Sequence, residues 1–200
     1  MILHRGADRG QVLPLFIWIT GIILFVAFAF FAFAQAAVAR SGAQAAADSA
    51  ALAAAQDGRD DLVEGLVASF GEGDDGVDWL SGVAPHGANA RNAASDLAAQ
   101  NDASVLTTEE VSVRGLDGYS VSVETRYTVG ESVIPGTESM RAKADAVAVI
   151  EPRCEMQGDF DSSNSVSFVC DGDIFELDPE DFEDGDVPDS SILFSVYLVG

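Results

Sequence analysis

The strongest constraint on this chain is a run of thirty residues without a charge, Gly10 to Ala39, close to the start of the sequence. A helix needs about 20 apolar residues, at about 1.5 Å each, to cross a hydrocarbon core of about 30 Å. The run exceeds that length and predicts a membrane-spanning helix. Two alternatives stay open: a cleaved secretory signal that ends near Ala39, and a buried helix of a soluble protein.

The charges that flank this run predict its orientation. His4, Arg5 and Arg9 precede it, opposed by Asp8, and Arg40 follows it. Basic residues favour the cytoplasmic side of a membrane. We therefore expect a single-pass protein of the cell membrane, with a short cytoplasmic N-terminus and a large extracytoplasmic part.

Acidity rises along the chain, which carries a formal net charge of -23. The first fifty residues hold two acids and three bases, whereas the last fifty hold 14 acids and one base. Such a field repels nucleic acid and anionic lipid headgroups, so it argues against phosphate-bearing partners. It favours solubility and repulsion between copies, with binding of divalent cations or of a basic protein as the alternative.

Two cysteines, Cys154 and Cys170, lie in the expected extracytoplasmic part. In an oxidising compartment such a pair predicts a disulfide that closes a loop of about 15 residues and stabilises the fold by on the order of 3 kcal/mol. Two free thiols are the alternative. A metal site would need further ligands, and the two histidines are His4, before the span, and His86, isolated near Gly and Pro.

The apolar run continues through Arg40 into an alanine-rich stretch, residues 41–56. Because Ala is the strongest helix former, we expect one helix from about Leu13 to Gln56, with Gly42 as its weak point. Asp57-Gly58 is the expected stop. Two explanations of the alanines stay open: close packing against another element, and helix propensity alone.

Two shorter helices are expected after this one. Residues 59–70 place Leu or Phe at every fourth position, which is one face of an amphipathic helix, and residues 90–101 place small side chains inward. Between them, residues 71–87 are rich in Gly and Asp and predict a loop. Trp79 and Leu80 in that loop are expected to reach the core.

Alternating apolar and polar residues predict three antiparallel strands, over residues 104–115, 118–130 and 139–151. Alternate residues from Tyr119 to Tyr127 would share one face of the second strand. The alanines from Ala142 to Ala148 would share a face of the third, where a helix could lie close to the sheet.

Turn-forming residues separate the strands. Turns are expected at Leu116-Asp117-Gly118 and Ile134-Pro135-Gly136, and Asp171-Gly172 predicts a two-residue hairpin between residues 165–170 and 173–177. Residues 192–199 predict a last strand at a sheet edge, with pairing to another protein as the alternative.

These elements predict an α+β fold, in which a long transmembrane helix continues into an extracytoplasmic helix and packs on an antiparallel sheet. An acidic extension that contains the disulfide follows. The expected segments are a cytoplasmic N-terminus (1–9), a transmembrane helix (10–39), an alanine-rich helix extension (40–56), an extracytoplasmic α+β domain (57–150) and the acidic extension (151–200).

The sequence contains no G-x-S-x-G, no Gly-rich phosphate loop with a Lys and no H-E-x-x-H. We therefore expect neither catalysis, nor a cofactor, nor a small-molecule substrate. The acidic extension offers candidate calcium ligands, which are Asp159, Asp161, Asp181, Asp184 and Asp186. Oxygen side chains alternate from Asp159 to Ser165 as in an EF-hand loop, but the central Gly and the terminal Glu of that loop are missing.

Two motifs frame the predicted helix. The first is Arg9-Gly10-Gln11-Val12-Leu13-Pro14-Leu15, and the second is Gln44-Ala-Ala-Ala-Asp48-Ser-Ala-Ala-Leu52-Ala-Ala-Ala55. In this order they resemble the N-terminal module of the TadE/TadG-like proteins of Tad (tight adherence) pilus assembly. The alternating strands before Ala142 to Val149 also fit that family, whereas residues 151–200 lie outside the resemblance.

The resemblance implies a pilin-like fold and a membrane-anchored structural or assembly role in Flp-type (Tad) pilus biogenesis, as a pseudopilin-like protein or an envelope assembly factor. Its partners would be the bilayer and other pilus-assembly or pilin-like membrane proteins, bound through the N-terminal helix. The alternative is an adhesin-like, cation-binding head on a membrane anchor. One departure stands out: prepilin-like proteins are cut after a Gly with Glu at the fifth mature position, and a cut after Gly10 would place Leu15 there.

Overall fold

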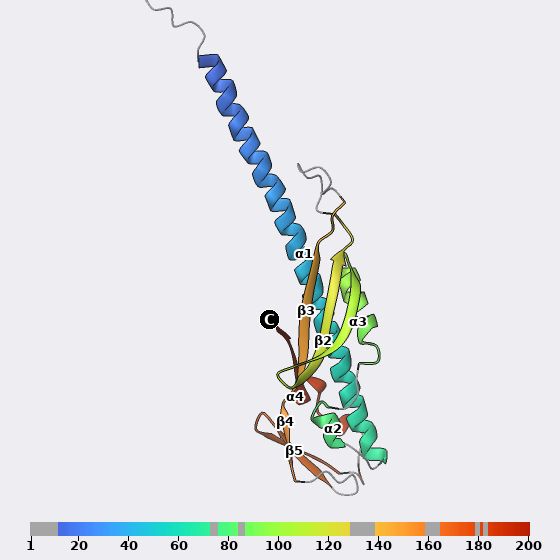
Figure 1. Ribbon diagram of the computed structural model, residues 1–200. Coiled ribbons are helices and arrows are strands. Elements are labelled where there is room, and N and C mark those ends of the chain that lie inside the picture. Colours follow the sequence, from blue (N-terminus) through green and yellow to red (C-terminus); the bar gives the residue numbers. More distant parts are fainter. Residues whose placement is uncertain are drawn as a thin grey trace, which may run out of the picture.

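The computed structural model describes residues 12–72, 76–83, 87–128, 139–158, 165–178, 181 and 184–200. It shows one long helix whose N-terminal part stands free and whose C-terminal part lies against a sheet (Figure 1). Ala39 is the first buried residue of this helix. The part of the chain from Ala39 onward is called the head below.

Helix α1 runs without interruption from Val12 to Glu72, over 61 residues, so it is about 90 Å long at about 1.5 Å per residue. The stop expected at Asp57-Gly58 is wrong. A glycine inside a helix costs only about 1 kcal/mol. Gly58 is itself buried, and burial of Ala54, Ala55 and Leu62 in the same stretch of α1 offsets that cost. The separate helix expected after this point is the last part of α1, with Leu62 and Leu66 buried.

The main sheet is antiparallel, with the strand order β1-β2-β3-β7. Its strands are β1 (Ala103–Val113), β2 (Leu116–Thr125), β3 (Lys143–Pro152) and β7 (Phe194–Val199). The three-stranded meander and the edge position of the last strand are both confirmed. The helical turn α4 (Ser190–Leu193) leads into β7.

Two helices cover one face of this sheet: α1 packs on β2, β3 and β7, and α3 (Ala90–Gln100) packs on α1 and β1. The layer between them is made of small side chains. The alanines with no exposed surface in this layer are Ala43, Ala46, Ala47, Ala50, Ala51, Ala54, Ala55, Ala94, Ala98, Ala103 and Ala148. Close packing, and not helix propensity alone, therefore accounts for the alanine-rich stretch, and the buried face expected for the third strand is confirmed.

The turn between β1 and β2 differs from the expected one. Arg114 and Gly115 form it with φ of 57° and 85°, and Leu116 already pairs with Val113. Gly118 is required for another reason, because a Cβ there would overlap the backbone of β3. The other expected turn, at residues 134–136, lies outside the described residues.

Trp79 and Tyr127 each differ in part from what the sequence predicts. Trp79 lies in a short helix, α2 (Gly76–Leu80), within the stretch predicted as a loop. Its ring covers Gly65 of α1, where a Cβ would overlap the indole, and Leu80 is buried as expected. Tyr127 lies beyond the end of β2, so its inclusion in the second strand is wrong. Its hydroxyl nevertheless lies against Gly42 of α1, on the same side of the sheet as the alternate residues from Tyr119 to Thr125.

A second, smaller sheet has the strand order β4-β5-β6. Its strands are β4 (Cys154–Gln157), β5 (Val166–Cys170) and β6 (Asp173–Leu177), and a 3-10 turn (Asp184–Asp186) follows. Cys154 and Cys170 face each other in adjacent strands and form the predicted disulfide. The predicted hairpin at Asp171-Gly172 is confirmed, with both residues at positive φ.

Candidate functional site

The first part of α1, residues 12–38, projects from the head, and every residue in it is exposed except Ala32, which is half-buried (Figure 1). Its large side chains are exposed, for example Phe30 at 76% and Phe33 at 80%. At about 1.5 Å per residue this part is about 40 Å long, enough for a hydrocarbon core of about 30 Å. The helix is thus long and apolar enough to cross a membrane.

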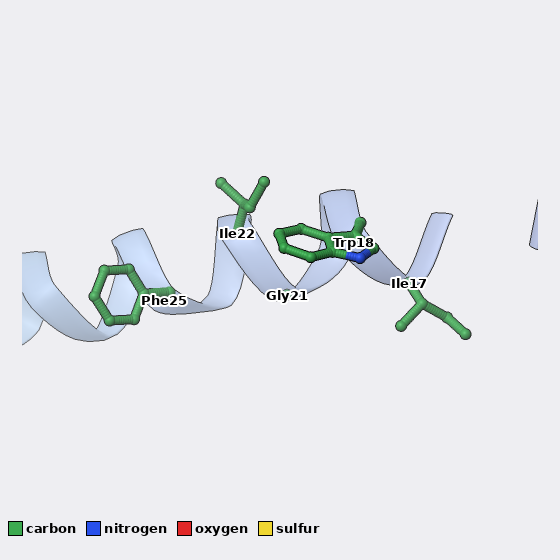
Figure 2. Close-up of a pocket in the computed structure, with 5 residues that line it drawn as sticks. All are labelled: Ile17, Trp18, Gly21, Ile22 and Phe25. Carbon is green, nitrogen blue, oxygen red and sulfur yellow. The ribbon is translucent and has the colours of Figure 1, made fainter. Parts of the chain in front are cut away.

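A hollow lies on the surface of the exposed helix around Gly21. Figure 2 shows Gly21 between the larger side chains, with Trp18 and Ile22 beside it. Ile17, Trp18, Gly21, Ile22 and Phe25 line a hollow of about 360 Å³, and nothing lies within 4 Å of the place where a Cβ of Gly21 would stand. The hollow is open to whatever surrounds the helix, a lipid chain or a side chain of a neighbouring helix.

The polar residues of the second motif attach α1 to the sheet. The side-chain amide of Gln44 donates to a carboxylate oxygen of Asp48, one turn along the helix, at 2.8 Å. The same nitrogen lies 3.5 Å from the backbone carbonyl oxygen of Asp145 in β3, to which it also donates. Asp48 therefore orients Gln44 toward the sheet, which is a positioning role for the acidic residue of the motif.

Ser49, the next residue of the motif, lies toward the end of α3. The side-chain amide of Asn101, which caps the C-terminus of α3, donates to the hydroxyl of Ser49 at 3.1 Å. That hydroxyl donates in turn to the backbone carbonyl of Ala46 at 3.0 Å. The motif thus combines alanines that allow close approach with polar groups that fix α1 against β3 and α3.

Two carboxylates farther along α1 hold the segment that leads into α3. Asp61 accepts hydrogen bonds from the backbone N–H groups of Gly87 and Ala88, at 2.7 and 2.9 Å, and Asp57 accepts one from Asn89 at 3.1 Å. Burial and the negative charge of Asp61 raise the pKa of Asp57 above its ordinary value, although the hydrogen bond from Asn89 acts in the opposite direction. Burial likewise raises the pKa of Tyr119, which faces the same carboxylates.

Asp57→Asn is expected to stabilise the protein slightly at pH 7. A raised pKa means that the folded state holds the proton more tightly than the unfolded state, so this contribution to stability is present below pH 3.8, the ordinary pKa, and is lost as the pH rises through the folded-state value. Asparagine keeps the acceptor oxygen without the charge. We expect the free energy of unfolding at pH 7 to rise by about 0.5 kcal/mol or less, because solvent screens most of the charge of this partly exposed carboxylate.

Urea unfolding of the full chain in detergent micelles, at neutral pH and at a pH near 3.8, measures this effect. Asp96→Asn, on the exposed side of α3, removes the same charge without touching residues 87–89. A gain that persists equally at the acidic pH, or that Asp96→Asn reproduces, would contradict the assignment.

Only some of the candidate calcium ligands lie among the residues that the structure describes. Asp159 and Asp161 lie outside the described residues. Asp184 and Asp186 lie in the 3-10 turn, and Asp181 stands shortly before it. In the part of the chain that the structure describes, His, Cys, Asp and Glu side chains form no group of three or more that could hold a metal ion.

The structure likewise describes only part of the first sequence motif, from Val12 onward. Arg9, Gly10 and Gln11 lie outside the described residues, and Pro14 lies in the first turn of α1, where its missing N–H is not needed.

Residues 10–57 match a family model, Tad, whose description is "Putative Flp pilus-assembly TadE/G-like". This segment is similar to the Tad module. It contains the exposed part of α1 and the alanine-rich part that packs in the head. The match therefore extends over both parts of this one helix. No curated protein and no solved structure matches the chain. The Tad module supports involvement in Flp pilus assembly and a structural or assembly role.

Sequence reasoning missed two contacts that shape the region where α1 enters the head. Gly42, expected as a weak point of the helix, lies under Tyr127, and a Cβ at Gly42 would overlap the tyrosine hydroxyl. Asp57 and Asp61, spaced by one helical turn, hold residues 87–89. The spacing of these two acids was visible in the sequence, but the segment that they hold was not.

Proposed function

We propose that this protein is a membrane-anchored, pseudopilin-like structural component of Flp (Tad) pilus assembly. The single observation that carries the proposal is the division of α1 into an exposed apolar part and a part whose inner face is buried in the head. The residues that match the Tad model extend from the first part into the second. Because α1 is one continuous helix, a change in the molecules that contact residues 12–38 can move the head.

Exchange of lateral contacts supplies the mechanism. In the bilayer, lipid tails surround the exposed helix. Since lipid tails are as apolar as the side chains, helices in a membrane associate through close packing and not through a hydrophobic driving force. The hollow at Gly21 and the projecting Phe25 give this surface the relief that close packing needs. A subunit of this kind can move from lipid contacts to contacts with pilin-like helices and anchor or nucleate a filament.

We propose that the N-terminus is cytoplasmic and the head extracytoplasmic. Three basic or titratable residues before the span, His4, Arg5 and Arg9, support this orientation. The disulfide between Cys154 and Cys170 also supports it, because disulfides persist in oxidising compartments. We further propose that Leu15, at the position where prepilin-like proteins carry Glu, leaves the chain uncut after Gly10.

Deletion of the gene in its native host is expected to reduce surface pili to background, and wild-type protein supplied in trans is expected to restore them. Electron microscopy of the cell surface counts the pili. The matched variant replaces residues 12–38 by a polyleucine helix of equal length, which keeps the anchor but removes the side-chain relief. We expect it to stay in the membrane fraction without restoring pili.

Normal piliation of the deletion strain would overturn the proposed function. Restoration of pili by the polyleucine variant would instead show that the helix acts as an anchor only, and would overturn lateral exchange as its mechanism. N-terminal sequencing of the membrane form tests the uncut N-terminus in the same preparation.

A further inference from the structure

A cavity lies where α1 leaves the head. It has a volume of about 400 Å³ and is lined by Phe31, Ala34, Gln35, Val38, Ala39, Tyr127 and Thr128. The helical residues of this set span the last 12 Å or so of the uncovered apolar part, at about 1.5 Å per residue. If residues 12–38 cross a membrane, the cavity lies at one surface of the bilayer, with its apolar wall on the lipid side.

Tyr127 closes this cavity from the side of the head. Its hydroxyl lies against Gly42 of α1, and the residue as a whole is 38% exposed. Tyrosine is enriched at the level of lipid headgroups, because its ring is apolar and its hydroxyl is polar. The residue therefore has the chemistry of the bilayer surface at the place where the anchor meets the head.

Four basic residues lie near the end of the sheet where α1 leaves the head. Arg40 follows Ala39 in α1, Arg126 precedes Tyr127, Arg141 lies just before β3, and Lys143 is the first residue of β3, which Figure 1 shows beside α1. These four exposed residues are four of only ten bases in a chain of net charge -23. They are called the basic collar below.

Arg40 and Arg126 carry positive charge that no described carboxylate balances, whereas the other two members of the basic collar share one carboxylate. Glu124 lies 3.7 Å from Arg141 and 3.6 Å from Lys143, so one carboxylate faces two bases. Arg126 donates to the hydroxyl of Ser104 at 3.1 Å. Among the described residues, no carboxylate forms an ion pair with Arg40 or Arg126.

We propose that this junction binds an anionic phospholipid, with the headgroup at the level of the basic collar and the first part of an acyl chain in the cavity beside Tyr127. The proposal rests on the membrane anchoring in the proposed function. The net charge of the chain predicts repulsion of anionic headgroups, but the acids concentrate in residues 151–200, whereas the basic collar lies next to the anchor. Attraction at the near end and repulsion at the far end would hold the head upright on an anionic membrane.

Native mass spectrometry of the full chain in detergent, with added phosphatidylglycerol or phosphatidylcholine, tests the proposal. Wild-type protein is expected to retain phosphatidylglycerol over phosphatidylcholine, and increasingly so at low ionic strength. Arg40→Gln combined with Arg126→Gln is expected to weaken phosphatidylglycerol retention about 25-fold, since each basic residue near an anionic surface accounts for about fivefold. Arg91→Gln combined with Arg114→Gln removes the same charge from exposed positions outside the basic collar and is expected to leave retention unchanged.

Tyr127→Ala provides a second readout. It opens the cavity without changing charge and is expected to reduce retention of both lipids. Equal retention of the two lipids by wild-type protein, or equal losses in the two double variants, would overturn the proposal. Salt-sensitive association between copies without retained lipid would also overturn it and would assign the basic collar to the acidic extension of a second copy. Failure of wild-type protein to float with vesicles of either lipid would instead overturn the membrane anchor itself.

Discussion

Replacement of both Cys154 and Cys170 by serine is expected to lower the free energy of unfolding by about 3 kcal/mol, the value for a cross-link that closes a loop of about 15 residues. The two residues are 16 positions apart and join β4 to β5. An isolated two-stranded hairpin is only marginally stable, and the disulfide ties β4 to the hairpin of β5 and β6. For a head of this size the loss corresponds to a decrease in Tm of roughly 6–12 °C.

The effect should reach the whole head, because the small sheet shares its core. Phe168 of β5 is buried together with the alanines of α1, and its ring stacks on that of Phe175 at 5.7 Å between centroids. Loss of the disulfide therefore weakens packing on α1 as well as the hairpin. Urea unfolding followed by the fluorescence of Trp79, in a Trp18→Phe background, measures the head alone.

Two controls separate the covalent bond from the change of side chain. A reducing agent should destabilise wild-type protein by a similar amount and should leave the double serine variant unchanged. If reduced wild-type protein keeps its stability while the serine variant loses it, the effect comes from burying two hydroxyl groups and not from the cross-link.

Much of the fold follows from patterns within single segments. The uncharged run and the alanines that follow it predicted a helix that continues out of the membrane, and alternation predicted the meander. The hairpin at Asp171-Gly172 followed from a two-residue turn signal between apolar runs. In each case the residues that decide the structure are neighbours in sequence, so the pattern and its cause are read together.

The failures have a common physical origin, which is packing between segments far apart in the chain. Asp57-Gly58 carries a local stop signal, but Asp57 is used to hold Asn89 and Gly58 is buried, so tertiary contacts continue the helix. Gly42 has the composition of a weak point, yet it makes room for Tyr127. Sequence patterns identify such residues as unusual without showing what they contact.

The candidate site divides in the same way. The span and the motif that ends it were predicted from the sequence and match the Tad model. The basic collar was not, because Arg40 and Arg126 are far apart in sequence and the overall charge of the chain suggested the opposite behaviour. Only the pairing of β2 and β3 beside α1 brings these residues to one level.

Ala50→Leu is expected to destabilise the head by about 3 kcal/mol, at the upper end of the range for overpacking a filled core. Ala50 has no exposed surface and lies in the layer between α1 and its neighbours. The three additional carbon atoms would push α1 away from the sheet. Helix propensity cannot produce this loss, since leucine is nearly as good a helix former as alanine.

Ala45→Leu is the matched control, because Ala45 lies on the exposed side of α1, five residues before Ala50. We expect its free energy of unfolding to change by no more than about 0.5 kcal/mol, as for other surface substitutions. Urea unfolding with the Trp79 readout compares the two variants. Equal stability of both variants would mean that α1 is not closely packed in the head, and a rigid connection between the exposed helix and the sheet would then be untenable.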